Sequence, residues 1–200
     1  MLKKMPQQER SRAMVGSILE AATRILGSRP LCEATTNQIA ALAGVGIGSL
    51  YQYFGSKDDI VECLLEQHRV DSLALAERVL RETPGSVAAR YRAMLRELLA
   101  LHERARMLHL NFLALQGGTP PSDKLPEIQQ HLELVAQLLR DECPQMDRVS
   151  ALLHAQVMMR SVHALVHCTI QLEDPQRDHI ALGHFDAFVP QYCRFTELRT

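Results

Sequence analysis

The segment from residue 35 to 57 constrains the fold most, because two short helical patterns flank a glycine there. It reads TTNQIAALAGVGIGSLYQYFGSK and holds four of the chain's ten glycines and three of its nine aromatic residues. Two threonines, with a glutamine in the following turn, offer an N-cap for a helix over 37–43. Gly44 ends that helix, and a second helix is expected over 47–54. Two short helices joined by a glycine turn predict a helix-turn-helix.

The second helix of this motif has one apolar side and one small, polar side. Leu50 and Phe54 lie four residues apart and share a face, which leaves Gly48, Ser49 and Gln52 pointing outward, with Tyr51 and Tyr53 on the flanks. We expect the small core of the motif to consist of Ile39, Leu42, Val45, Leu50 and Phe54. The opposite side is free to meet a partner.

The outward side chains have the chemistry needed in the major groove of DNA. The absence of a side chain at Gly48 lets the backbone approach, Ser49 can bond a phosphate or a base edge, and Gln52 can pair with adenine. Tyr51 and Tyr53 can stack or bond through their hydroxyls. Plain packing is the alternative for the aromatic residues, but it does not explain why Ser49 and Gln52 point outward.

Charge also favours a polyanion partner at the N-terminal end. Lys57 and Thr36 each lie at an expected helix start, where phosphates bind readily. Residues 1–30 carry a balance of +4, although the whole chain has a net charge of −1. The net charge excludes a generally basic nucleic-acid coat protein.

The motif resembles the TetR family of transcriptional regulators. The pattern I-A-x-x-A-G-V-x-x-G-S-L-Y-x-Y-F-x-S-K runs from Ile39 to Lys57, and the resemblance covers roughly residues 10–64. The chain departs from the family at Gly46, where serine is frequent, and at Ile47, where a polar or basic residue is common. The resemblance implies a DNA-facing set of Thr36, Gly48, Ser49, Tyr51, Gln52, Tyr53 and Lys57.

The remainder of the chain reads as helical. Leu and Ala total 51 residues against 20 for Val and Ile, which favours helices over strands, and no alternating strand pattern occurs. We expect an all-α fold with a helix-turn-helix domain over 1–56 and a helical body over 57–200. About nine helices are expected, over 9–27, 37–43, 47–54, 57–81, 87–115 with a break near 103–106, 125–142, 147–172 and 175–194.

Cysteine usage and missing motifs narrow the class further. The five cysteines are scattered without a CxxC pair, which argues against a disulfide framework and favours the cytoplasm. The polar start lacks a signal-peptide pattern, and no membrane span is expected. Because GxSxG, P-loop, GxGxxG and HExxH motifs are all missing, we do not expect an enzyme.

The resemblance implies that the body dimerises and binds a small molecule that repositions two DNA-reading heads. It also favours a repressor that binds a pseudo-palindromic operator as a homodimer. Core packing is the alternative for each apolar candidate, since methionines fill ordinary cores as well as pockets. The expected ligand is small and mostly apolar, and the candidate residues are Met94, Leu98, Met107, Phe112, Leu138, Met159 and His163.

Two histidines on one body helix leave other functions open. His163 and His167 lie four residues apart and can share a zinc ion, whereas Cys168 points about 100° away from His167. No further ligand is identifiable, so a solvated or dimer-facing stripe is the simpler interpretation, and we expect no metal or other cofactor. A metal-responsive regulator and a helical interaction protein without DNA binding are the alternatives.

Overall fold

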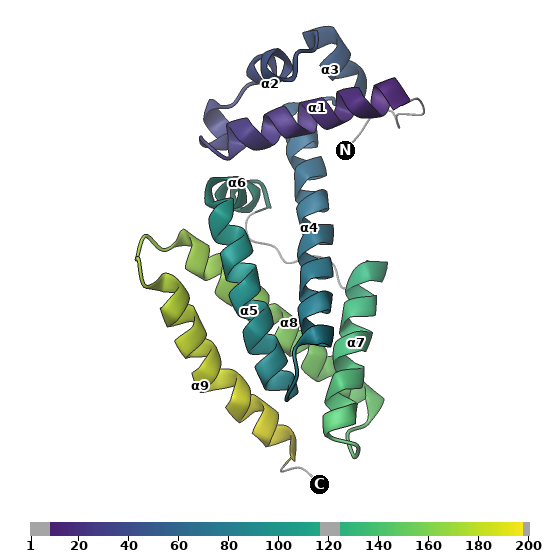
Figure 1. Cartoon of the computed structure of the whole chain (residues 1–200), viewed down its shortest axis with the longest axis vertical. Coiled ribbons are helices and arrows are strands. Elements are labelled where there is room, and N and C mark those ends of the chain that lie inside the picture. The colour runs from purple at the N-terminus through teal and green to yellow at the C-terminus, as the bar shows by residue number, and fades with distance from the viewer. Residues whose placement is uncertain (1–8, 117–124, 198–200) are drawn as a thin grey trace. The chain divides into compact units, whose positions relative to one another are not determined.

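The computed structural model describes residues 9–116 and 125–197, and most of these residues lie in helices (Figure 1). The described parts contain nine α-helices, one 3-10 turn and no strand, which confirms the all-α prediction. The elements are α1 (Glu9–Leu26), η1 (Leu31–Glu33), α2 (Thr36–Ala43), α3 (Ile47–Tyr53), α4 (Lys57–Glu82), α5 (Val87–Arg104), α6 (Arg106–Gln116), α7 (Pro126–Glu142), α8 (Arg148–Gln171) and α9 (Arg177–Glu197).

The helix ends agree with the sequence patterns to within three residues. The expected break near 103–106 is confirmed, because α5 ends at Arg104 and α6 begins at Arg106. The η1 turn was not expected, because three residues are too few to show a helical pattern of apolar residues. No helix within residues 9–116 or 125–197 is long and apolar enough to cross a bilayer.

The chain forms two compact units, which we call the head and the body. The head comprises residues 1–69 and 105–118, and the body comprises residues 70–104 and 119–200. This division differs from the expected boundary after residue 56. The beginning of α4 and all of α6 belong to the head, although α6 follows α5 of the body in sequence.

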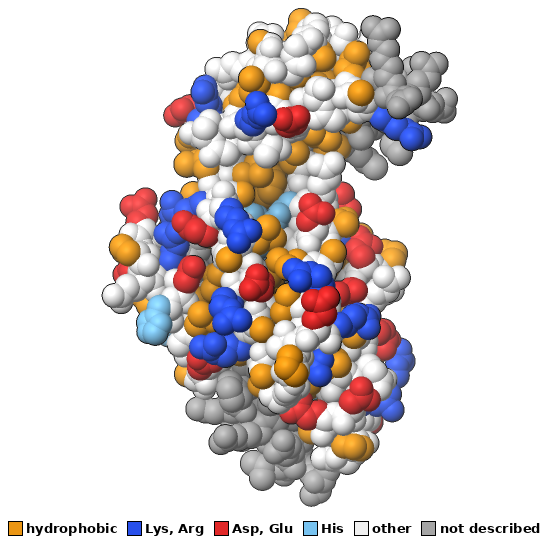
Figure 2. Space-filling view, in the orientation of Figure 1, with side chains coloured by type: hydrophobic (Ala, Val, Ile, Leu, Met, Phe, Trp, Pro, Cys, Tyr) orange, Lys and Arg blue, Asp and Glu red, His pale blue; other side chains and the backbone are white. Residues whose placement is uncertain are grey.

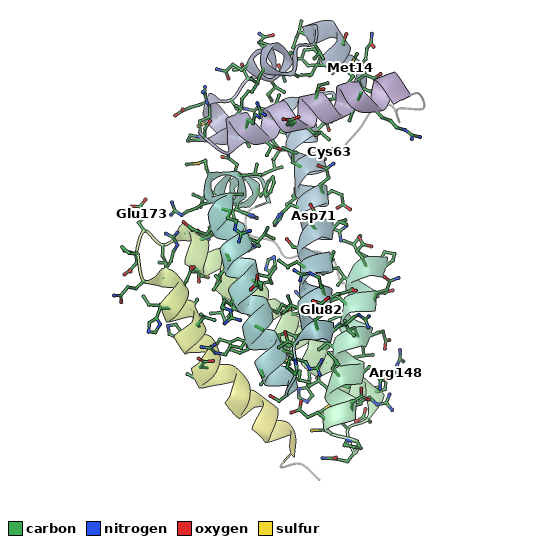
Figure 3. The ribbon with its side chains drawn as sticks, in the orientation of Figure 1. Met14, Cys63, Asp71, Glu82, Arg148 and Glu173 are labelled. Carbon is green, nitrogen blue, oxygen red and sulfur yellow. The ribbon has the colours of Figure 1, made fainter. Side chains whose placement is uncertain are left out.

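The head has an apolar core of its own. Helix α1 packs against α2 and α6, and Met14 of α1 and Cys63 of α4, both labelled in Figure 3, pack at its margin. The expected core place of Leu42 is wrong: its side chain is 50% exposed. Helix α2 buries Ile39 and Ala40. Leu42 comes two residues after Ala40, so its side chain points about 200° away around the helix axis, toward solvent. The fully buried head residues are Ile18, Ala22, Leu26, Ile39, Leu50, Phe54, Ile60 and Val61.

Helix α6 is fastened to the corner between α1 and η1 by one side chain. The buried Asn111 donates through Nδ2 to the carbonyl oxygens of Leu26 (2.8 Å) and Arg29 (3.0 Å). Its Oδ1 accepts from the backbone N–H of Leu31 at 2.7 Å. A single amide therefore satisfies three backbone groups at the end of α1, where helix carbonyls lack partners within the helix.

The ends of α2 are set by local hydrogen bonds. Thr35 Oγ1 accepts from the Gln38 N–H at 3.2 Å, and Gln38 Oε1 accepts from the Thr35 N–H at 2.9 Å, which confirms the expected cap. Gly44 ends the helix with a φ of +68°, in the left-handed region that other residues avoid. The glycine therefore allows the sharp turn into α3.

The body packs α8 against α5, α7 and α9. Arg92 of α5 pairs with Asp186 of α9 at 2.7 Å, and Arg177 at the start of α9 pairs with Glu103 near the end of α5. These pairs lie at the margin of an apolar core. The fully buried members of that core are Leu80, Tyr91, Leu95, Val135, Ala151 and Ala155.

Candidate nucleic-acid interface

Helix α3 has an inner side in the head core and an outer side exposed to solvent. Leu50 is fully buried, as expected, whereas Gly48 and Gln52 are exposed and Ser49 is half-buried. The expected flank position of Tyr53 is corrected, because its side chain is only 8% exposed and packs in the head core. Its ring face is therefore not available for stacking on a base.

Tyr51 is oriented by a hydrogen bond to the start of α2. Its hydroxyl lies 2.9 Å from Thr36 Oγ1, and the Tyr51 side chain is 44% exposed. The bond joins two residues of the predicted DNA-facing set across the helix-turn-helix. The bond orients the ring on the outer side of α3.

The start of α3 is open to close approach by another molecule. A Cβ placed on Gly48 would meet nothing within 4 Å, so no packing within the chain requires glycine there. Glycine inside a helix costs about 0.5–1 kcal/mol relative to alanine. The missing side chain therefore has no structural reason within the described protein.

The sequence places Lys57 at a helix start where it could bind phosphate, but in the structure its ammonium group also binds backbone within the head. Its Nζ donates to the carbonyl oxygens of Leu31 (2.5 Å) and Ala34 (2.9 Å), so the ammonium group joins the start of α4 to η1. An ammonium group has three N–H donors. Two of them bind within the described part of the head.

The outer face of the helix-turn-helix carries no formal charge. From residue 34 to 56 the sequence contains no Asp, Glu, Lys or Arg, and Figure 2 shows few charged side chains on the visible face of the head. Charges begin at the edges of this stretch, with Glu33 before it and Lys57 after it. Contacts on this face must therefore use neutral hydrogen bonds and apolar surface.

The seven predicted ligand-binding residues are divided between the two units. Met107 and Phe112 lie on α6 in the head, and Phe112 is buried in the head core. The other five lie in the body. Of those five, Met94 is a buried core residue, and Leu98, Leu138 and Met159 pack against the body core.

The two histidines considered for metal binding stack on each other. The ring centroids of His163 and His167 are 3.8 Å apart. Burial, followed by the charges of His163 and His102, lowers the pKa of His167 to about 4, and burial and Arg160 lower the pKa of His163. Both rings are thus neutral near pH 7. Cys168 is exposed.

One buried polar residue of the body was missed by sequence reasoning. His131 of α7 is almost fully buried, and burial lowers its pKa to about 4. Its Nδ1 has no hydrogen-bond partner within the described ranges, and neither has Nδ1 of His167. The sequence pattern could have predicted this burial, because His131 lies on the same helix face as Ile128, Leu132 and Val135.

An exposed recognition helix on a small helical head defines a helix-turn-helix DNA-binding protein. Residues 18–64 match the family described as bacterial regulatory proteins, tetR family. The head therefore carries the helix-turn-helix segment that marks this family of bacterial regulatory proteins.

Solved structures show the same fold over nearly the whole chain. A TetR-family transcriptional regulator from Pectobacterium atrosepticum has a TM-score of 0.72 at 15% identity, covering 94% of this chain and 95% of that one. The TetR-family repressor AlkX from Dietzia sp., implicated in biodegradation of n-alkanes, has a TM-score of 0.58 at 19% identity, covering 89% and 94%.

A complex of SmeT with triclosan has a TM-score of 0.55 at 18% identity, covering 88% of this chain and 90% of that one. No curated protein is significantly similar to this chain in sequence.

Proposed function

We propose that this regulator is a repressor that binds a pseudo-palindromic operator as a homodimer and is released by a small, mostly apolar ligand. The observation that carries the DNA-binding part is the Thr36 to Tyr51 hydrogen bond beside the exposed Gly48 and Gln52. An oriented ring, an open backbone and an amide lie on one outer face. These are the groups that a recognition helix uses in a major groove.

We propose different roles for the members of the predicted set. Gln52 reads a base edge, Ser49 and Thr36 bind phosphate or base edges, and Tyr51 contacts the DNA beside its bonded hydroxyl. Lys57 uses its remaining N–H on a phosphate, while Tyr53 contributes through the position of α3, since its ring is buried.

The homodimer is supported by exposed apolar residues around α8 and α9. Val149 and Leu153 of α8, Leu172 after it, and Ile180 of α9 are large, apolar and exposed. Apolar surface of this kind on a body helix pair favours a two-fold interface. Two heads related by that symmetry require half-sites about one helical turn apart, or slightly more.

The ligand proposal depends on the body core. Met94 and Met159 are adaptable side chains, and the buried His131 and the half-buried His167 each offer a buried, neutral imidazole nitrogen without a partner in the described residues. A mostly apolar molecule with one uncharged polar group would satisfy such an anchor. The complex of SmeT with triclosan supports a small-molecule ligand for a protein of this fold.

The test is a selection of duplexes from a random-sequence pool by the full-length protein, followed by titrations at several salt concentrations. We expect a two-fold symmetric consensus, and an affinity that falls as salt rises, because phosphate contacts release counterions. Gln52→Ala should change the preferred base at one position in each half-site. Lys57→Ala should weaken all sequences alike and lower the salt slope by roughly one.

Two outcomes separate the alternatives. A helical interaction protein without DNA binding would select no consensus and show no salt-dependent affinity. A metal-responsive regulator would select a consensus, but its release would require a divalent metal and would be lost in His163→Ala and His167→Ala together. Sedimentation of the free protein as a folded monomer at micromolar concentration would contradict the homodimer.

A further inference from the structure

An exposed apolar surface lies at the start of the recognition helix. Ile47 is the first residue of α3 and its side chain is 38% exposed, and Tyr51, four residues later, is 44% exposed. Residues four apart lie on the same helix face. Ile47 and Tyr51 therefore form one apolar face on α3, which we call the Ile47–Tyr51 face.

Among the described residues of the head, this face stays partly exposed, and the glycines beside it are not required by packing. Gly46 caps α3 without a side-chain hydrogen bond, and a Cβ on Gly48 would meet no atom within 4 Å. The two glycines leave Ile47 projecting from backbone that another molecule can approach closely. The hydroxyl of Tyr51 is already bonded to Thr36, so its ring presents carbon to a partner.

The floor of the major groove offers one apolar group, the C5-methyl of thymine. All other groups that the bases present there are hydrogen-bond donors or acceptors. The N-terminal residues of a recognition helix are those that reach the base edges. An isoleucine at that place has no polar atom, so a methyl group is the base substituent that suits it best.

We infer that the Ile47–Tyr51 face reads thymine, with Ile47 packing on a C5-methyl in each half-site of the operator. Ile47 is then a specificity-determining residue in addition to Gln52. This inference rests on the proposed DNA binding and names one base that it selects. Burial of one methyl group is worth a factor of about four in affinity.

Deoxyuridine tests the inference because it differs from thymidine only by the missing methyl group. Each thymine of the selected duplex is replaced in turn, in both half-sites, and affinity is measured for the full-length protein. For the wild type, we expect deoxyuridine at one position in each half-site to weaken binding about fourfold per half-site. With Ile47→Ala, the thymine duplex should bind more weakly and the deoxyuridine penalty at that position should disappear.

Two further variants serve as matched controls. Ile47→Val retains branched apolar carbon and should keep the thymine preference. Val70→Ala removes another exposed apolar side chain, on α4 outside the helix-turn-helix, and should keep the full deoxyuridine penalty. Because both sites are exposed, thermal unfolding should show that all variants fold.

The outcomes distinguish this inference from the proposed function. If a consensus is selected but no deoxyuridine penalty depends on residue 47, the Ile47–Tyr51 face does not read thymine, while DNA binding stands. If the penalty persists unchanged in Ile47→Ala, another residue reads the methyl group and the inference is overturned. If no consensus is selected, the proposed function fails and this inference fails with it.

Discussion

Asn111 Nδ2 lies 2.8 Å from the carbonyl oxygen of Leu26, which joins α6 to the last residue of α1 although 85 residues separate them in sequence. The same amide binds Arg29 and Leu31. The Asn111 side chain is buried, and both its nitrogen donor and its oxygen acceptor form hydrogen bonds. Asparagine fits because one planar group supplies both kinds of atom.

Asn111→Leu should destabilise the head by about 2–4 kcal/mol, because it leaves partly buried backbone groups without partners. Asn111→Asp should be destabilising as well, since carboxylate oxygens would face the carbonyls of Leu26 and Arg29. Urea denaturation measures both. An unchanged midpoint and slope for Asn111→Leu would contradict the role assigned to these bonds.

Lys57→Met should lower the free energy of unfolding by about 2 kcal/mol, because two hydrogen bonds from a charged donor are lost and the apolar chain is kept. The matched control is Arg24→Met, which removes an exposed pair with Glu20. Such surface pairs contribute little, so the control should change stability by less than about 0.5 kcal/mol. Equal effects of the two variants would show that the contacts with Leu31 and Ala34 are not stabilising.

Gly48→Ala should raise stability and lower DNA affinity. The new Cβ meets no atom of the protein, so α3 gains up to about 1 kcal/mol, while the added methyl group obstructs approach to DNA. Gly16→Ala is the control, because Gly16 lies inside α1 with equally open space. It should stabilise without affecting DNA binding, as thermal unfolding and binding titrations can show.

Stability should fall as the pH is lowered through the range set by His131. The unfolded chain has an ordinary histidine pKa near 6.5, whereas burial lowers the pKa of His131 in the folded chain to about 4. Between these values the unfolded chain binds a proton that the folded chain does not. The contribution of His131 to the free energy of unfolding is constant above pH 6.5. On acidification to pH 5, that free energy falls by about 2 kcal/mol.

The measurement compares urea denaturation of the wild type and His131→Leu at pH 7.5 and pH 5. The variant should lose less stability on acidification than the wild type. The exposed His179 provides the control, since His179→Gln should retain the wild-type difference. A variant with the same loss as the wild type would show that His131 is not the group responsible.

The helices and the recognition motif were predictable because they depend on local pattern. The capping box at Thr35 and the left-handed Gly44 follow from neighbouring residues, and the structure confirms both. Leu42 and Tyr53 were placed on the wrong sides because helix periodicity alone does not say which neighbour covers a short helix. Contacts such as those of Lys57 with Leu31 depend on the packing of separate elements, which no local pattern contains.

The inclusion of α6 in the head has a consequence for exchanging parts between regulators. A chimera that takes only residues 1–69 would lose Leu108 and Phe112 from the head core and Asn111 from the end of α1. Its recognition helix would then pack on a head core that lacks the residues of α6. The transferable DNA-reading module of this protein therefore consists of two separate stretches of chain, and a graft must carry both.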